Sequence, residues 1–172
     1  ERGTHWLAGG RLVGYKRFDL IVQAFTKLGL PLKIFGQGPE EKKLKRMAGK
    51  NIEFLGAVDD QSKYRLYGGA IGFLHPQIED FGITAIEAMA AGKPVIAYNR
   101  GGACETIIDG ETGRFFSRPC WQDIGNAVIR FDPTRFSPER IRAHAERFSK
   151  QIFQNNMRAF IEETIKKESR RV

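Results

Sequence analysis

Two glutamates, Glu79 and Glu87, stand eight residues apart in EDFGITAIEAMAAG, where most neighbours are apolar or small. The spacing predicts a helix over 83–92, with Glu87 roughly 8 Å along its axis from the start. With Ile, Ala and Met around it, this helix is expected to lie buried between other layers. A buried carboxylate is costly to desolvate unless it is paired or hydrogen-bonded. Two explanations fit: a salt bridge to a lysine or arginine, or hydroxyl groups of a sugar-like ligand that both glutamates bracket.

The start of this helix has the chemistry of an anion site. The backbone N–H groups of Gly82, Ile83 and Thr84 have no partner within a helix that begins there, and a helix N-terminus favours phosphate. A glycine at the first position lets the chain approach an anion closely. A phosphate here, with sugar hydroxyls on either side, describes a nucleotide sugar.

A second candidate stretch is AGGRLVGYKRFD, residues 8–19. It follows a predicted strand but does not match the GxGxxG pattern, which disfavours a nicotinamide or flavin cofactor. Instead it carries Arg11 and Lys16, and cations on a strand-to-helix loop can neutralise a diphosphate. The simpler alternative is that these basic side chains are only solvated.

The elements that position these residues alternate between short apolar runs and segments of helical period. This alternation is typical of βαβ units and predicts an α/β fold, a Rossmann-like parallel sheet with helices on both faces. Strands are expected at 5–9, 32–36, 52–55, 70–74, 94–98 and 113–117, and helices at 17–29, 40–49, 60–68, 83–92, 121–131 and 137–168.

Glycines follow almost every predicted strand. Because the carboxyl ends of parallel strands meet at one edge, these flexible positions are expected at the edge where such sheets bind ligands. Gly101 and Gly102 serve either ligand approach or a turn, and His75 is either a packed residue or a neighbour of the ligand. The candidate binding glycines in these loops are Gly10, Gly36, Gly38 and Gly82.

Past residue 150 the sequence predicts a long helix with an apolar stripe. The stripe either belongs to the core or docks on something outside this chain. Its members are Ile152, Phe153, Met157, Phe160, Ile161 and Ile165.

Composition limits the function classes. The chain has 172 residues, 41% of them apolar and 28% charged, as expected for one soluble globular domain. No apolar run is long enough to cross a bilayer and no leader opens the chain, so a cytoplasmic location is expected, with peripheral contact at the inner membrane face considered. Cys104, expected to be buried, and Cys120 cannot form a disulfide framework, and no metal site is predicted.

The net charge of +8 invites a nucleic-acid or anionic-membrane partner. Residues 130–172 hold 11 Lys and Arg against 6 Asp and Glu, so most of the excess lies in the tail. A solvated helix face explains this, and attraction to anionic lipid is the alternative. Nucleic acid is disfavoured because the chain has no recognition motif and no basic stretch interleaved with aromatics.

Seven pieces of the sequence, in order, resemble family 4 of the retaining glycosyltransferases, and specifically the nucleotide-sugar-binding C-terminal half of their two-domain GT-B architecture. The resemblance covers about Gly9 to Phe116. The pieces are GGRLVGYKRFD, IFGQGPE, IEFLGAVDD, RLYGGAIGFLHP, EDFGITAIEAMAAGKPVIA, GGACETI and DGETGRFF.

This resemblance implies roles for the candidate residues. Glu79 would contact the donor sugar and Glu87 the ribose hydroxyls, while Arg11 and Lys16 would bind the departing diphosphate. The amides at Gly82, Ile83 and Thr84 would bind the distal phosphate, with Gly10 in the neighbouring loop. The loops at Gly36, Gly38 and Val58 would flank the base.

The KRFD and EDFGI versions of two motifs resemble mannosyltransferases of surface-polysaccharide and lipopolysaccharide assembly, which implies GDP-mannose as donor and a glycan or lipid-linked acceptor. No cofactor or metal is implied. Enzymes of the family are about twice as long, so residues 1–149 are expected to be the donor-binding domain and 150–172 a helix that crosses toward an acceptor domain. Alternatives are a non-catalytic nucleotide-binding module and a GT-B UDP-sugar epimerase or transferase.

Overall fold

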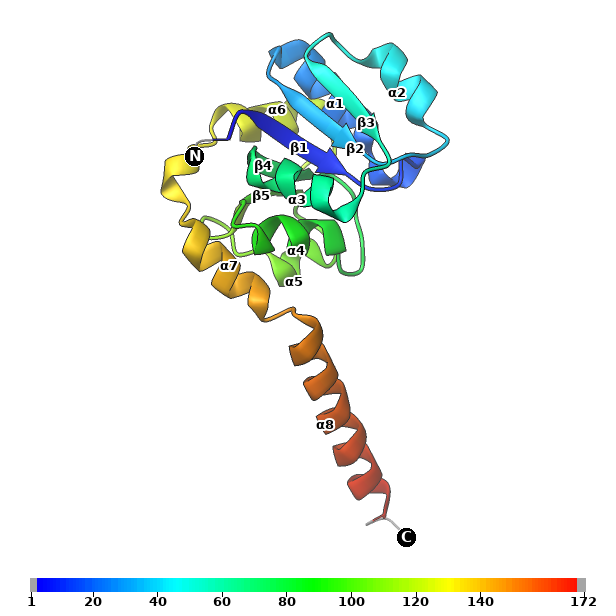
Figure 1. The fold of residues 1–172 in the computed structure, drawn as a ribbon, viewed down its shortest axis with the longest axis vertical. Coiled ribbons are helices and arrows are strands. Elements are labelled where there is room, and N and C mark those ends of the chain that lie inside the picture. Colours follow the sequence, from blue (N-terminus) through cyan, green and yellow to red (C-terminus); the bar gives the residue numbers. More distant parts are fainter. Residues whose placement is uncertain (1–2, 170–172) are drawn as a thin grey trace.

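A computed structural model describes residues 3–169 of the chain, so the predicted divisions 1–149 and 150–172 each extend beyond the described part. Its centre is a six-stranded parallel sheet in the order β3-β2-β1-β4-β5-β6 (Figure 1), which confirms the predicted fold class. The strands are β1 (His5–Gly9), β2 (Leu32–Phe35), β3 (Ile52–Gly56), β4 (Ala70–His75), β5 (Val95–Tyr98) and β6 (Gly113–Phe116).

Helices and 3-10 turns connect the strands. The first helix ends at Gly29, whose φ of 69° is the left-handed conformation typical of a glycine after a helix. The helices are α1 (Phe18–Leu28), α2 (Glu41–Met47), α3 (Asp60–Gly68), α4 (Ile83–Ala90), α5 (Ala103–Thr106), α6 (Trp121–Ile129), α7 (Pro138–Glu146) and α8 (Lys150–Ser169), and the 3-10 turns are η1 (Gly14–Lys16) and η2 (Pro133–Arg135).

The sheet separates two hydrophobic layers. Side chains alternate between its faces, so on β1 Trp6 and Ala8 belong to one layer and Leu7 to the other. Helices α1 and α6 cover the first layer, while α3, α4 and α7 contribute to the second. Both faces are thus covered, as an all-parallel sheet requires.

The strand order changes direction between β1 and β4. The chain moves outward from β1 to β2 and β3, and then returns to pair β4 with the other side of β1. The loops that follow β1 and β4 therefore diverge at one point on the carboxyl edge of the sheet. Ligands of open α/β sheets bind at such a switch point.

The C-terminal region differs from the prediction in two ways. The single helix expected over 137–168 is two helices, because Phe148 turns to pack edge-on against Phe81 and the carbonyl of Ser149 accepts the first hydrogen bond of α8. The core interpretation of the apolar stripe is wrong for the described residues. Helix α8 extends away from the body (Figure 1), and Phe160 is 67% exposed.

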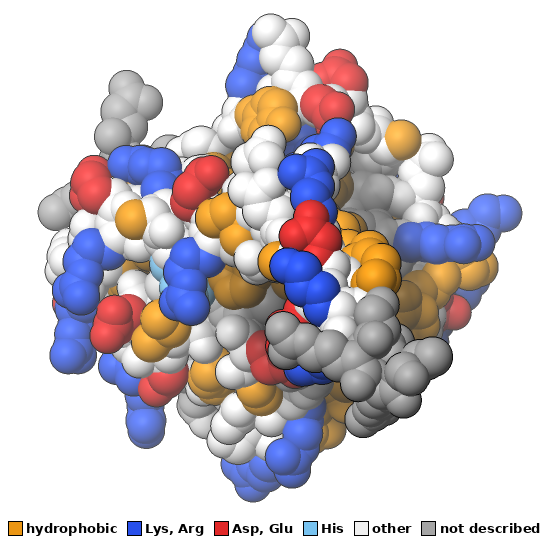
Figure 2. All heavy atoms as spheres, turned by 90° about the horizontal axis from the view of Figure 1, so that it is seen from below, with side chains coloured by type: hydrophobic (Ala, Val, Ile, Leu, Met, Phe, Trp, Pro, Cys, Tyr) orange, Lys and Arg blue, Asp and Glu red, His pale blue; other side chains and the backbone are white. Residues whose placement is uncertain are grey.

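Figure 2 views the molecule from the side toward which α8 extends. Lys and Arg side chains are spread around this face with hydrophobic side chains between them. Between residues 3 and 169, no helix is both long and apolar enough to cross a membrane.

Candidate functional site

A pocket of about 460 Å³ opens at the switch point between β1 and β4. One side is the 3-10 turn that follows β1, and the other is the loop that joins β4 to α4. Both sides come from stretches that the sequence analysis selected. The lining residues are Tyr15, Lys16, Ile78, Glu79, Asp80, Phe81, Gly82, Ile83 and Thr84.

Lys16 and Glu79 meet across this pocket. The lysine Nζ lies 2.6 Å from the glutamate Oε1, and the side chains are only 13% and 17% exposed. The pair joins the loop after β1 to the loop after β4, which are 63 residues apart in the chain. A partly buried ion pair at the mouth of a pocket supplies one cation and one hydrogen-bond acceptor to any polar molecule that enters.

Glu87 has a different environment. Its two carboxylate oxygens accept hydrogen bonds from Lys63 at 2.8 Å and from the Tyr67 hydroxyl at 2.9 Å. The hydrogen bond to Glu87 raises the pKa of Lys63, and burial followed by the Glu87 charge raises the pKa of Tyr67. The salt-bridge explanation for Glu87 is therefore observed.

The expected burial of α4 on nearly all sides is wrong. Glu87 is 28% exposed, and Ile83 on the same helix is 66% exposed. Alanines and Met89 make up its buried face. The desolvation cost of the Glu87 carboxylate is therefore lower than the sequence implied, because part of its side chain reaches solvent.

The N-terminus of α4 opens into the pocket. Gly82 has φ of 87°, and among the described residues the first amide here that donates to the backbone is that of Ala85, to the Gly82 carbonyl at 3.0 Å. The Thr84 hydroxyl is buried without a hydrogen-bond partner in the described part of the chain. Nearby, His75 Nδ1 and Gln77 Oε1 are also buried and unpaired. Of these three groups, Thr84 belongs to the pocket lining, so its hydroxyl is available to a polar ligand there.

His75 lies directly behind this pocket. Its side chain is almost fully buried, and desolvation lowers its pKa to about 4, with Lys16 lowering it further and Glu79 opposing the shift. A side chain at Gly82 would place its Cβ 3.0 Å from the imidazole Cε1. His75 is thus a neutral packing residue that also borders the ligand edge, so both sequence interpretations hold in part.

The glycines of the loops after β1 and β2 pack against the backbone. A Cβ on Gly36 would overlap the carbonyl oxygen of Gly10, and one on Gly38 would overlap that of Leu12. Hydrogen bonds from Gly10 to Phe35 and from Leu12 to Gln37 hold these two loops together. These glycines shape the edge of the sheet, and no contact in the described structure assigns them to a ligand.

The sequence left open whether Gly101 and Gly102 serve ligand approach or a turn, and it did not predict their contact with the loop of Glu79. The Gly102 amide donates to the Glu79 carbonyl at 2.7 Å, and a Cβ on Gly102 would overlap the Asp80 carbonyl oxygen. The paired glycines after β5 therefore fix the loop that carries Glu79. Their position after a strand is the sequence signal that selects them.

Six predicted site residues lie outside the pocket lining: Glu87, the loop glycines Gly10, Gly36 and Gly38, and also Arg11 and Val58. Arg11 is exposed in the loop after β1, and Val58 is half-buried against the second hydrophobic layer. The expected burial of Cys104 is wrong, since it is exposed with its Sγ 3.2 Å from Asn99 Oδ1. Residues 3–169 contain no group of three His, Cys, Asp or Glu side chains arranged to hold a metal ion.

A family model described as glycosyl transferases group 1 matches residues 6–148, which include the pocket and all of the sheet except His5, the first residue of β1. The chain belongs to this family. The resemblance that the sequence motifs carry is thereby confirmed at the level of the family and its GT-B fold.

Relatives of this group 1 glycosyl transferase include sugar transferases from several organisms. The chain is 42% identical over 77 residues, 44% of its length, to an alpha-1,3/1,6-mannosyltransferase ALG2 of Dictyostelium discoideum. It is 32% identical over 145 residues, 73% of its length, to a GDP-mannose-dependent alpha-(1-6)-phosphatidylinositol monomannoside mannosyltransferase of Mycolicibacterium smegmatis. The matched parts are 18% and 38% of those proteins, so the chain spans less than half of their length.

Solved structures show the same fold. Sucrose-phosphate synthase of Thermosynechococcus elongatus superposes with a TM-score of 0.82 and 25% identity, over 94% of this chain and 46% of that protein. Anabaena HepE, solved in complex with UDP and glucose, superposes with a TM-score of 0.78 and 22% identity, over 96% of this chain and 48% of that one. The Rossmann-like sheet of this group 1 glycosyl transferase thus has the fold of about half of each of these two proteins.

Proposed function

We propose that this domain binds GDP-mannose for a retaining transfer of mannose to a glycan or lipid-linked acceptor. The observation that carries the proposal is the Lys16–Glu79 pair, 2.6 Å apart, beside the open N-terminus of α4. A diphosphate needs cations and amide donors, and a sugar needs a carboxylate that accepts hydrogen bonds from its hydroxyls. The mannosyltransferase relatives support mannose, and the one that depends on GDP-mannose supports GDP as the nucleotide.

The phosphates would bind where positive charge gathers. The Lys16 side chain would leave Glu79 and form an ion pair with the diphosphate. The amides of Gly82, Ile83 and Thr84 would bind the distal phosphate at the positive end of α4. Arg11 would add a second cation if its side chain turned inward from the same loop. These donors would stabilise the negative charge that develops on the leaving nucleotide, which lowers the barrier to transfer.

The two carboxylates would bind the hydroxyl groups of the donor. Glu79, released from Lys16, would accept from the sugar, and Glu87, held by Lys63 and Tyr67, would accept from the ribose. The base would lie against the loops of Gly36, Gly38 and Val58. No residue of the pocket is placed as a covalent nucleophile in this scheme, so the departing phosphate would take the acceptor proton on the same face, and no metal ion is required.

The acceptor would bind outside this chain. Support comes from the exposed stripe on α8 and from the lengths of the relatives, which exceed that of the chain. We expect residues 150–172 to pack on an acceptor-binding domain, with contact between the basic tail and an anionic membrane as the alternative. In a longer protein with both domains, Phe160→Asp should lower activity while leaving donor binding to this chain unchanged.

A UDP-sugar is the second candidate donor, because the HepE neighbour was solved with UDP and with UDP-glucose. Isothermal titration of the chain with GDP-mannose, GDP, UDP-glucose and UDP separates the two. Selective binding of GDP and GDP-mannose supports the proposal, and selective binding of UDP and UDP-glucose overturns the choice of base. Donor binding without any sugar transfer by a two-domain protein would identify a nucleotide-binding module instead.

A further inference from the structure

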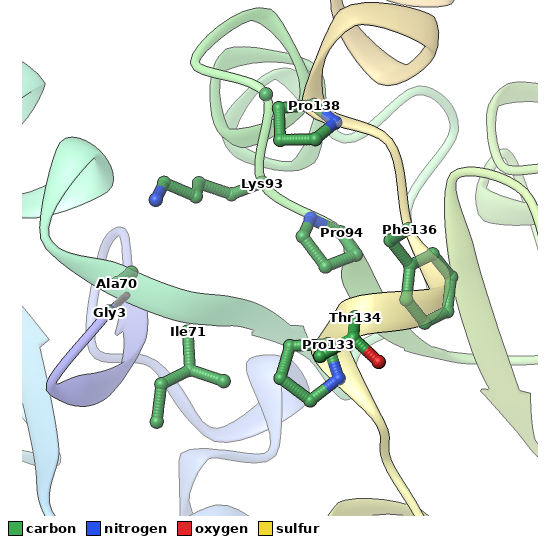
Figure 3. Close-up of a pocket in the computed structure, with 10 residues that line it drawn as sticks. Gly3, Ala70, Ile71, Lys93, Pro94, Pro133, Thr134, Phe136 and Pro138 are labelled. Atoms are coloured by element: carbon green, nitrogen blue, oxygen red, sulfur yellow. The ribbon is translucent and has the colours of Figure 1, made fainter. Parts of the chain in front are cut away.

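The opposite edge of the sheet holds two adjoining pockets that the proposed function does not use. The first has a volume of about 480 Å³ and lies between the start of β4, the start of β5 and the 3-10 turn η2. Its walls are largely apolar, and they include Ile71, Pro94, Pro133 and Phe136 (Figure 3). This volume is in the range of small-molecule sites in proteins.

The second pocket, of about 720 Å³, continues from the first. The two share Gly92, Lys93 and Pro138, and the second adds Arg65 and Arg142. The lining residues of both pockets include no Asp or Glu. An apolar compartment therefore adjoins a compartment lined by three cations.

Lys93 stands at the junction and is held there by the end of α4. Gly92 has φ of 75°, and the Lys93 amide donates to the Ala88 carbonyl at 2.9 Å, as in a helix end closed by a left-handed glycine. In Figure 3 the Lys93 side chain extends so that its amino group is at the end remote from Phe136 and Thr134. The hydrocarbon stem thus borders the pocket while the charge lies at one end of it.

The Lys93 charge has no acidic partner among residues 3–169. Burial lowers its pKa, and repulsion by the neighbouring Arg142 lowers it further. Within the described part of the chain, the ion pair of Arg142 is with Glu139, a side chain that is 75% exposed, at 3.2 Å. A partly buried cation next to a second cation is unfavourable, and an anion bound between them would relieve the repulsion.

We propose that the two pockets form one binding site for a small amphipathic anion. A hydrocarbon chain occupies the apolar pocket, and a carboxylate or phosphate head group lies among Lys93, Arg142 and Arg65. The site is at the amino edge of the sheet, opposite the proposed donor site, and it stands whether or not the donor proposal holds.

Isothermal titration with a set of matched probes tests this site. Octyl phosphate and octanoate carry both parts, octanol lacks the charge, and inorganic phosphate lacks the chain. We expect each anionic amphiphile to bind roughly tenfold or more tightly than octanol or phosphate alone. The stronger of the two anionic probes identifies the head group. Binding of octanol as tight as that of both anions, or no binding of any amphiphile, overturns the proposal.

Two further arms locate the site. Lys93→Gln should weaken binding of the anionic probe roughly tenfold, Lys93→Arg should retain it, and Lys42→Gln at an exposed, unpaired lysine should change nothing. Arg142→Gln is the second variant if Lys93→Gln does not fold. In the wild-type chain the probe should slow acetylation of the Lys93 amine, followed by peptide mass spectrometry, and leave that of Lys42 unchanged. Equal protection of Lys93 and Lys42 from acetylation contradicts the site. Unchanged affinity for the anionic probe in both Lys93→Gln and Arg142→Gln contradicts it as well.

Discussion

The two edges of the sheet carry pockets of contrasting chemistry, one of about 460 Å³ at the carboxyl edge and two adjoining ones of about 480 and 720 Å³ at the amino edge. At the carboxyl edge, the pocket pairs its cation with an acid, and buried groups of His75, Gln77 and Thr84 lack partners within the described chain. At the amino edge, the pockets have apolar walls and cations without an acid among their lining residues. The first edge fits a polar ligand with many hydroxyl and phosphate groups, and the second fits a mostly apolar one with a single charge.

The difference follows from what the backbone does at each edge. Loops after the strands carry glycines in close contact, so amides and carbonyls approach the ligand space at the carboxyl edge. At the amino edge the lining of the first pocket includes Pro94, Pro133 and Pro138, and proline has no backbone N–H to offer a ligand. The positive charge there comes from the side chains of Lys93, Arg65 and Arg142, so a single substitution should weaken binding of an anion without abolishing it.

Gly102→Ala should have the largest effect on the comparison, because the added Cβ would overlap the Asp80 carbonyl and displace the loop of Glu79. We expect a loss of about 2–3 kcal/mol in the free energy of unfolding and loss of measurable GDP binding. Urea denaturation and titration measure both. Gly14→Ala is the matched control, since a Cβ there meets no atom within 4 Å. Equal effects of the two changes would contradict the contact.

Lys16→Met should weaken GDP binding by roughly 10- to 100-fold, because it removes a charge-assisted contact with the diphosphate. The isothermal titration that measures this includes Lys42→Met as a control for general loss of positive charge. Lys93→Gln belongs in the same series, since a change at the amino edge should leave GDP affinity within twofold of wild type. If Lys93→Gln weakens GDP binding as much as Lys16→Met does, the two edges do not act as separate sites.

Acidification should destabilise the carboxyl edge through His75. Its pKa in the folded chain is about 4, below its unfolded value of 6.5, so the unfolded state binds the proton first. The stability that neutral His75 contributes above pH 6.5 is lost as the pH falls toward 4. Between pH 7.5 and 4.5, wild type should lose about 2 kcal/mol more than His75→Gln in urea denaturation. An equal loss in both proteins would show that His75 does not cause it.

Tyr67→Phe should have the smallest effect. It removes one of the two hydrogen bonds to Glu87 and leaves the Lys63 ion pair. We expect a loss of about 1 kcal/mol in stability and a change in GDP affinity well below that of Lys16→Met. Thermal and urea unfolding measure the first, and titration the second. If Tyr67→Phe costs more free energy of GDP binding than free energy of unfolding, the Tyr67 hydroxyl lies nearer to the donor than its bond to Glu87 implies.

The sequence predicted all six strands within one or two residues, because each is a short apolar run that ends at a glycine or a turn. It also brought Lys16 and the α4 N-terminus to one edge, since parallel strands share a carboxyl edge. It did not identify Lys63 and Tyr67 as partners of Glu87, because they are 24 and 20 residues away and meet it only after α3 packs beside α4. The sequence also did not predict the four-residue helix α5 or the break at Phe148, because neither has enough residues to show a helical period of hydrophobic side chains.

Helix α4 begins at the carboxyl-edge pocket, and Gly92 and Lys93, which follow its last turn, line the pockets of the amino edge. Its eight residues span only about 12 Å. If a ligand at one end of α4 changes affinity at the other end, thermodynamic linkage makes the effect reciprocal. The factor by which octyl phosphate changes GDP affinity must equal the factor by which GDP changes octyl phosphate affinity. A factor of one would show that the two sites bind their ligands independently, with α4 as a rigid spacer between them. Any other value would show that the two sites are coupled, and α4 is the shortest connection between them.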